Sequence, residues 1–313
     1  FSFAIFSAAS RILRENPSAA GFSAADRLIA VGESQSAMFL TTYINAPDPL
    51  AAVYDGFLVH SRFGPAAPLD GTSILTEHGV TGVPTRFRPH LRVPVCNVLT
   101  ETDLIGGRLP GYHLARQPDD TLLRTWEIAG AAHADNYTIA VSFIDNGTAT
   151  PAELAAAYTP TDQLMGKQLD HYINFGPQHH YVVQAALAGL HDWVHTGSAM
   201  ASAPRLELTE TDPPELVLDP DGAATGGIRT PWIEVPTAVT SGTGSDETEL
   251  SFIFGSGRPF DAGELRRRYP GGRDEYLRKF AVALDSAIGA GHLCAADRPE
   301  ILAVADAAYP GAV

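Results

Sequence analysis

The ten residues LIAVGESQSA, at positions 28–37, constrain the fold of this chain more than any other segment. The first four form an apolar run that ends at Gly32, as expected for a short buried β-strand. Residues 36–44 have the pattern of a helix. Ser34 therefore falls in a tight turn between a strand and a helix, where the flanking positions must be small. Gly32 meets this need, and Ser36 stands where a second glycine is usual.

A serine in such a turn predicts a nucleophile. The turn lifts the Ser34 hydroxyl out of the sheet and sets it beside a helix N-terminus. There the backbone N–H of Gln35 is placed to donate a hydrogen bond to a developing oxyanion. The alternative interpretation is a serine that only caps the helix. We favour the nucleophile because the turn joins a buried strand to a helix.

Three further apolar runs, each bounded by turn residues, predict additional strands at 53–59, 93–99 and 122–129. The segments between them are long enough to cross over the sheet, which favours parallel strands. The predicted fold class is therefore α/β, with a mostly parallel sheet flanked by helices.

Two carboxylates and a histidine follow two of these predicted strands. Glu101 and Asp103 come after the run at 93–99, and His133 follows the run at 122–129. This is the chain order of a serine, acid and histidine triad on an α/β sheet, and ligands meet such sheets at the carboxyl ends of the strands. We favour Asp103 as the acid, since the last position of such a turn usually faces the histidine. Glu101 is the alternative acid; otherwise it lies in a solvated turn or bonds to the nucleophile turn.

Other polar residues are weaker candidates. His60 follows a strand end and either lines the pocket or has a structural role. Asp170, His171, His179 and His180 are close in sequence, but their spacing matches no metal-binding motif. We therefore expect no metal.

The organisation along the chain predicts two parts. Residues 1–202 form the core, with an insertion or lid at about 137–178 that has a helical patch at 152–158. A helix is predicted to follow at 181–195. Residues 203–313 form a β-rich extension. Its predicted strands are 206–208, 216–218, 232–235 and 250–254, and its final helix carries Leu277, Phe280, Leu284 and Ile288.

Charge excludes two classes of partner. The net charge is -15 and the isoelectric point is about 5.0, so nucleic acid and anionic membranes would be repelled. No window reaches the roughly 18 apolar residues that a membrane span needs. Cys96 and Cys294 are too few for a disulfide framework. We expect a soluble protein, cytoplasmic or secreted, that acts on a small molecule.

The start of the chain is unusual for this fold class. It begins at Phe1, inside an amphipathic helix that carries Phe3, Phe6, Ile12 and Leu13. Only this helix precedes the strand that leads to the predicted nucleophile. We therefore expect N-terminal strands to be missing from the chain, and the sheet to be completed by an N-terminal segment or a partner chain.

Five segments together resemble the bacterial "alpha/beta hydrolase domain" family: GESQSA, TETDL, WEIAGAAHADNY, LHDWVHTG and GGIRTPWIEVP. The resemblance implies an α/β-hydrolase fold with a long C-terminal extension that contains GGIRTPW. It also implies a carboxylic-ester hydrolase without a cofactor, and it assigns Ser34, one of the two carboxylates and His133 to the triad. An acyltransferase with the same triad and a non-catalytic binding protein on this scaffold are the alternatives.

Overall fold

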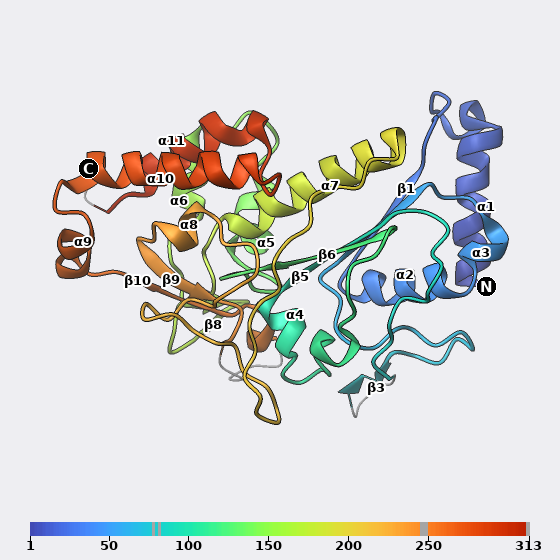
Figure 1. Ribbon diagram of the computed structural model, residues 1–313, viewed down its shortest axis with the longest axis horizontal. Helices are drawn as coiled ribbons and strands as arrows, with labels where there is room; N and C mark the ends of the chain where they lie inside the picture. Colours follow the sequence, from blue (N-terminus) through green and yellow to red (C-terminus); the bar gives the residue numbers. More distant parts are fainter. Residues whose placement is uncertain (77–78, 81–82, 245–249, 311–313) are drawn as a thin grey trace. The chain divides into compact units, whose positions relative to one another are not determined.

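The computed structural model describes residues 1–76, 79–80, 83–244 and 250–310 (Figure 1). Its main sheet has four strands in the order β1-β2-β5-β6, which are Ile29–Glu33, Gly56–His60, Val95–Thr100 and Leu123–Ile128. β1 pairs with β2, and β2 with β5, in parallel. Each of the four apolar runs therefore forms a strand of one sheet, and the predicted α/β class is confirmed.

The chain divides into two compact units. The first comprises Phe1–Leu99, Arg108–Thr125 and Ala186–Ser202, and the second comprises Thr100–Gly107, Trp126–Ala185 and Ala203–Val313. Each unit is described by itself below. The predicted division of the chain at residue 202 stays a prediction.

The first unit contains β1, β2, β5 up to Leu99 and the start of β6, with several helices. These helices are α1 (Ser2–Glu15), η1 (Pro17–Ala20), α2 (Gln35–Asn45), α3 (Asp48–Ala51), η2 (Tyr112–Ala115) and the end of α7 (Gln178–Thr196), with the short strands β3 (Leu75–Thr76) and β4 (Gly79–Val80). Helix α2 packs against β1 and β2. Its buried side chains join those of the strands in one core that includes Leu40, Tyr43, Phe57 and Val95.

Strand β1 lies at one edge of the four-stranded sheet. Its Val31 exposes 55% of its surface, whereas Ala30 and Gly32 are buried. The alternation shows that only one face of this edge strand is covered within the described residues.

Helix α1 forms as predicted, and the side that carries Phe3 and Phe6 faces the core: Phe3 packs against it, and the Phe6 ring centroid lies 4.9 Å from that of Tyr54. Phe6 and Ile12 are partly exposed, while Ser7 and Ser10 are buried. The Ser7 hydroxyl lies 2.7 Å from the Tyr43 hydroxyl, and Ser10 makes the same kind of hydrogen bond to Tyr54. The helix is thus held by small polar residues that meet two buried tyrosines.

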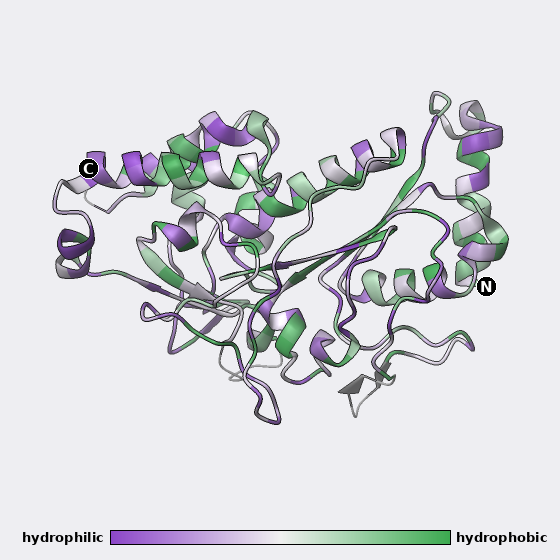
Figure 2. Ribbon diagram, in the orientation of Figure 1, coloured by the Kyte–Doolittle hydropathy of each residue, from purple (hydrophilic) through white to green (hydrophobic). Residues whose placement is uncertain are grey.

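The second unit combines short strands with most of the helices. Its elements are α4 (Glu101–Ile105), α5 (Asn136–Ile139), η3 (Val141–Phe143), α6 (Pro151–Ala157), β7 (Gln163–Leu164), β8 (Lys167–Gln168), α8 (Pro231–Glu234), β9 (Ala238–Ser241), η4 (Ser251–Ile253), β10 (Ser256–Pro259), α9 (Ala262–Arg268), α10 (Gly272–Gly289), η5 (Ala295–Asp297) and α11 (Arg298–Ala308), with the start of α7. Helix α11 packs against α6 and α10. Figure 2 shows α9 as strongly hydrophilic and α10 with residues of both kinds, as expected for helices with one solvent face.

Two predicted strands of the extension are wrong. Residues 232–235 lie mostly in helix α8, because Pro231 sits at its first position, where proline favours a helix start. Residues 250–254 contain the 3-10 helix η4 instead of a strand. The pieces at 206–208 and 216–218 pair only through isolated bridges. The predicted helix with Phe280 and Leu284 is confirmed as α10, which buries both, but it is not the final one, since α11 follows it. The helical patch at 152–158 is confirmed as α6.

Candidate active site

Ser34 occupies the turn between β1 and α2 in a conformation that only a few residues adopt. Its φ is 55° and its ψ is -121°, a region that favours glycine. The Ser34 N–H donates to the backbone carbonyl of His60, 3.0 Å away at the end of β2. The backbone is thus held in a strained turn by the neighbouring strand, as the strand-turn-helix pattern predicts.

Gly32 makes this turn possible. A Cβ atom at this position would lie 2.8 Å from the carbonyl oxygen of Ser36, closer than such atoms approach in proteins. The position therefore requires glycine because of the close approach of the first turn of α2. Ser36 is exposed, so its small hydroxymethyl group is accommodated where a second glycine is usual.

Gln35 is the first residue of α2. The N–H groups in the first turn of a helix lack carbonyl partners inside the helix and carry the positive end of its dipole. The Gln35 N–H thus belongs to the set of amides from which an oxyanion-binding donor is drawn in such a turn.

Asp103 and His133 form a buried pair in the second unit. His133 Nδ1 lies 2.6 Å from Asp103 Oδ1, and the two side chains expose 6% and 0% of their surfaces. The other Asp103 oxygen accepts hydrogen bonds of 2.8 Å from the N–H and the hydroxyl of Thr100, in the capping box of α4. An ionised Asp103 therefore assigns the proton of a neutral His133 ring to Nδ1, which makes Nε2 the basic nitrogen.

Thr102 holds the histidine loop through the backbone. Its Oγ1 accepts a hydrogen bond of 3.2 Å from the His133 N–H and donates one of 2.5 Å to the Gly242 carbonyl. The loop that carries His133 is thereby joined both to α4 and to the segment that follows β9.

Glu101 has a different role from its neighbour Asp103. Its carboxylate accepts hydrogen bonds from the N–H groups of Gly130 (2.5 Å) and Gly242 (2.7 Å) and from the Ser241 hydroxyl (2.9 Å). The side chain is 1% exposed, so the interpretation as a solvated turn is wrong. Burial raises the pKa of Glu101, and the three hydrogen bonds oppose that shift. The carboxylate that faces His133 is that of Asp103.

The three histidines that the sequence grouped with Asp170 each form a pair with a single carboxylate. The distances are 2.9 Å for His171 and Asp170, 3.7 Å for His179 and Asp135, and 3.3 Å for His180 and Asp145. Among the residues that the structure describes, no group of three or more His, Cys, Asp or Glu side chains is arranged to hold a metal ion. His60 is half-buried at the end of β2.

Arg229, in the predicted extension, has a structural role. Its guanidinium forms ion pairs with Asp219 (2.9 Å) and Glu234 (2.5 Å) and donates to the Ala224 carbonyl. These contacts join the start of α8 to the turn at 219–224.

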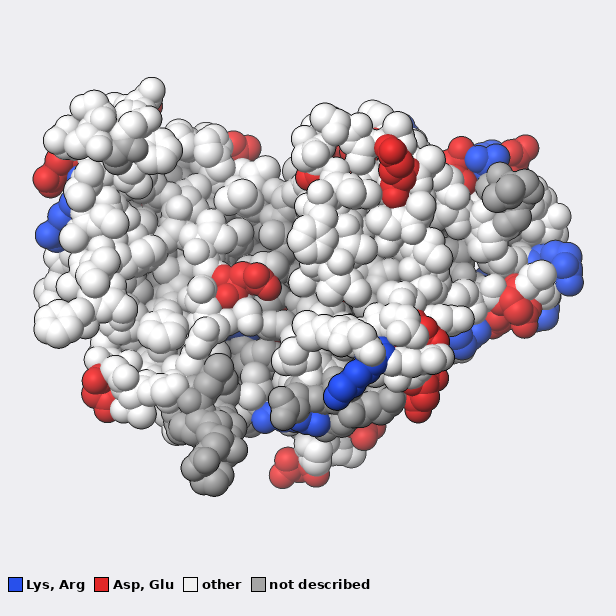
Figure 3. Space-filling model, turned by 180° about the vertical axis from the view of Figure 1, so that it is seen from behind, with Lys and Arg blue, Asp and Glu red and all other residues white. Residues whose placement is uncertain are grey.

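Two observations concern nucleic acid and membranes as partners: the distribution of charge on the surface and the hydropathy of the helices. Figure 3 shows one face on which Lys and Arg occur in small groups among Asp and Glu, rather than in one broad basic area. Within the described ranges, no helix is both long enough and apolar enough to cross a bilayer.

The comparisons with known proteins agree with the architecture. A family model described as "Alpha/beta hydrolase domain" matches residues 1–303. No curated protein and no solved structure matches the chain.

Proposed function

The chain belongs to the alpha/beta hydrolase domain family, and on this basis we propose that it is a serine hydrolase that cleaves a carboxylic ester through an acyl-enzyme. Ser34 is the nucleophile, His133 the general base and Asp103 the acid that orients it. The observation that carries the proposal is the buried 2.6 Å contact between Asp103 and His133. A buried carboxylate bonded to one imidazole nitrogen prepares the other nitrogen to accept a proton.

The strained turn at Ser34 supports the same proposal. A serine with φ of 55° costs on the order of 1–3 kcal/mol, and such strain is concentrated at functional sites. A capping serine has no need for it, because N-cap residues usually have an extended backbone.

The proposed reaction has two steps. His133 Nε2 takes the Ser34 proton as Oγ attacks the ester carbonyl carbon, and the Gln35 N–H donates to the resulting oxyanion. The proton then passes to the leaving alcohol, and the acyl group stays on Ser34. A water molecule, deprotonated by the same histidine, attacks the acyl carbon; the bond to Ser34 Oγ then breaks, the histidine returns the proton to Oγ, and the carboxylic acid is released. This chemistry uses only side-chain and backbone groups of the chain.

The experiment that tests the proposal is a panel of p-nitrophenyl esters of increasing acyl length, assayed with the wild type and with Ser34→Ala. We expect release of p-nitrophenol by the wild type and a loss of about 10³-fold or more in the variant. Ser198→Ala, which changes an exposed serine outside the site, is the matched control. Equal rates for the wild type and Ser34→Ala would remove the proposal.

A fluorophosphonate probe separates the proposed hydrolase from a binding protein on the same scaffold. Mass spectrometry of the labelled protein should find the modification on the peptide that carries Ser34. Absence of labelling would favour the binding protein. Addition of an alcohol acceptor tests for acyl transfer, since a transferase yields a new ester in place of the free acid.

A further inference from the structure

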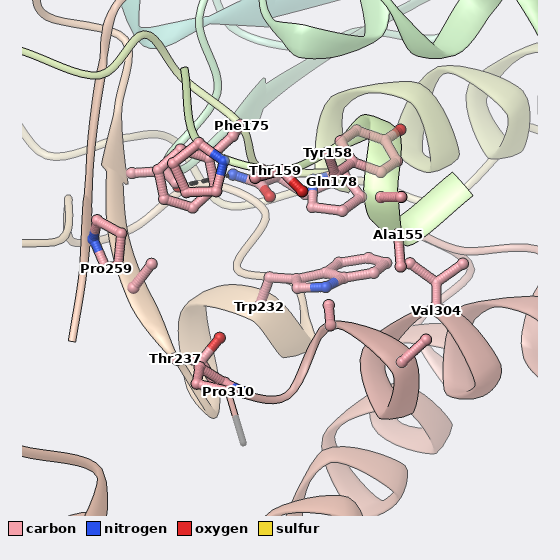
Figure 4. A pocket seen from close by; sticks show the side chains of 18 of the residues that line it. Ala155, Tyr158, Thr159, Phe175, Gln178, Trp232, Thr237, Pro259, Val304 and Pro310 are labelled. Atoms are coloured by element: carbon pink, nitrogen blue, oxygen red, sulfur yellow. Dashed lines mark hydrogen bonds between the residues drawn. The ribbon is translucent and has the colours of Figure 1, made fainter. Parts of the chain in front are cut away.

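The second unit contains a cavity that the proposed triad does not use. It has a volume of about 390 Å³, within the size range of small-molecule sites. Ser34, Asp103 and His133 are not among its described lining residues. Its walls come from α6, the turn before α7, the α8 to β9 region, α10 and α11. Figure 4 shows Ala155, Phe175, Trp232 and Val304 around it.

The lining is mostly apolar and carries no charged side chain. Among the described residues that line the cavity there is no Asp, Glu, Lys, Arg or His. Burial raises the pKa of Tyr158 and Tyr276, so both phenols are neutral near neutral pH. A charged ligand would lose its hydration here without gaining an ionic partner, which is strongly unfavourable.

Rings dominate the walls. The lining includes the aromatic rings of Trp232, Phe175 and Tyr276. It also includes four prolines: Pro160, Pro177, Pro259 and Pro310. The Trp232 indole is stacked on Tyr181, with ring centroids 5.6 Å apart and an interplanar angle of 12°. Phe280 meets it edge-on at 5.4 Å. These contacts fix the indole in place, so this wall exists before a ligand binds.

The amide of Gln178 closes the side nearest the histidine loop. Its Nε2 donates to the Gly130 carbonyl at 2.6 Å and to the Thr240 hydroxyl at 3.0 Å. The side-chain N–H donors of Gln178 are therefore hydrogen-bonded within the protein. The same contact joins the cavity to Gly130, three residues before His133.

From these observations we propose that the cavity is a binding site for a neutral, ring-bearing small molecule. The absence of charge in the lining selects against ionic ligands, and the flat faces of tryptophan, phenylalanine and proline select for planar rings. The site is defined by the second unit alone, and the proposal does not depend on whether Ser34 is a nucleophile.

A matched pair of fluorescent probes tests the chemistry. N-phenyl-1-naphthylamine is neutral, and 8-anilinonaphthalene-1-sulfonate has the same ring system with one sulfonate. We expect the neutral probe to bind saturably, with a Kd on the order of 10–100 µM, the range that ligand efficiency gives for its size. The sulfonate should bind at least about tenfold more weakly, because the cavity offers no cation. Equal or tighter binding of the sulfonate would overturn the proposal.

Two alanines on α11 locate the probe. Ala307 lines the cavity, and Ala303, one turn earlier, does not. Ala307→Phe should weaken binding of the neutral probe by about tenfold or more, because the phenyl group takes up space in the cavity. Ala303→Phe is the control and should bind the probe like the wild type. If Ala307→Phe does not fold, as judged by circular dichroism, Ala155→Phe on α6 takes its place. Unchanged binding in a folded cavity-filling variant would overturn the proposed site.

Discussion

The Oδ1 atom of Asp103 lies 2.6 Å from Nδ1 of His133, and both side chains are buried in the same unit. This pair is positioned by backbone contacts on both sides, since Asp103 belongs to the capping box of α4 and the His133 N–H is bonded to Thr102. Such support limits the freedom of the imidazole to rotate, which is what a general base requires.

The first prediction concerns Asp103→Asn. An asparagine amide placed against Nδ1 either donates to it or loses the contact, so the ring no longer presents a basic Nε2. We expect kcat for p-nitrophenyl acetate to fall by about 10³- to 10⁴-fold, as when other triads lose this carboxylate. Asp274→Asn, at an exposed carboxylate on α10, should leave kcat unchanged. A loss below about tenfold for Asp103→Asn would show that another group orients the base.

The second prediction concerns Glu101→Gln. The glutamate accepts two backbone N–H groups on separate oxygens, and a glutamine has only one acceptor, so a donor would face a donor. We expect the free energy of unfolding to fall by about 1–3 kcal/mol, measured by urea denaturation. Glu210→Gln, at an exposed position, is the control and should change it by less than about 0.5 kcal/mol.

The same carboxylate predicts a pH dependence. Burial raises the pKa of folded Glu101 above the ordinary glutamate value of 4.5, so the folded state binds the proton more tightly than the unfolded chain does. The folded state is stabilised in full at pH values below the ordinary glutamate pKa. This stabilisation is lost as pH rises through the pKa of Glu101 in the folded state. The stability advantage of the wild type over Glu101→Gln should therefore shrink as pH rises from about 4.5 upward. Urea denaturation of both proteins across this range measures it, and an advantage that grows with pH would contradict the sign.

The third residue to test is Gly32. Its replacement by alanine places a Cβ against the Ser36 carbonyl, which belongs to the backbone and has little room to move. We expect Gly32→Ala to lower the free energy of unfolding by about 1–3 kcal/mol. Gly289→Ala is the matched control, because a Cβ there meets nothing within 4 Å in helix α10. Two variants of equal stability would show that the turn relaxes.

The fifth prediction compares two changes at Ser34. Glycine adopts φ of 55° without a steric penalty, whereas alanine, like serine, has a Cβ atom and keeps the penalty. Ser34→Gly should be more stable than Ser34→Ala by about 1 kcal/mol in urea denaturation, and both should be inactive. If the alanine variant is as stable as the glycine variant, the backbone at Ser34 carries no strain.

Local patterns in the sequence determined the strand-turn-helix unit at Ser34. A buried apolar run, a glycine and a helical period lie within about fifteen residues, and steric limits on so short a turn leave few conformations. The same local reasoning predicted the other three strands of the sheet, since apolar runs of that length bury readily.

Only the tertiary structure decided between Glu101 and Asp103. Both residues lie at the end of β5, but their contacts differ. The N–H groups of Gly130 and Gly242, distant in sequence, donate to Glu101, whereas the His133 ring contacts Asp103. Helix α8 was misassigned for a different, local reason, since Trp232 and Ile233 are apolar enough for a strand and Pro231 favours a helix start at this position. Propensity acts over neighbouring residues, whereas the partners of a buried polar group come from anywhere in the chain, and these contacts depend on the fold as a whole.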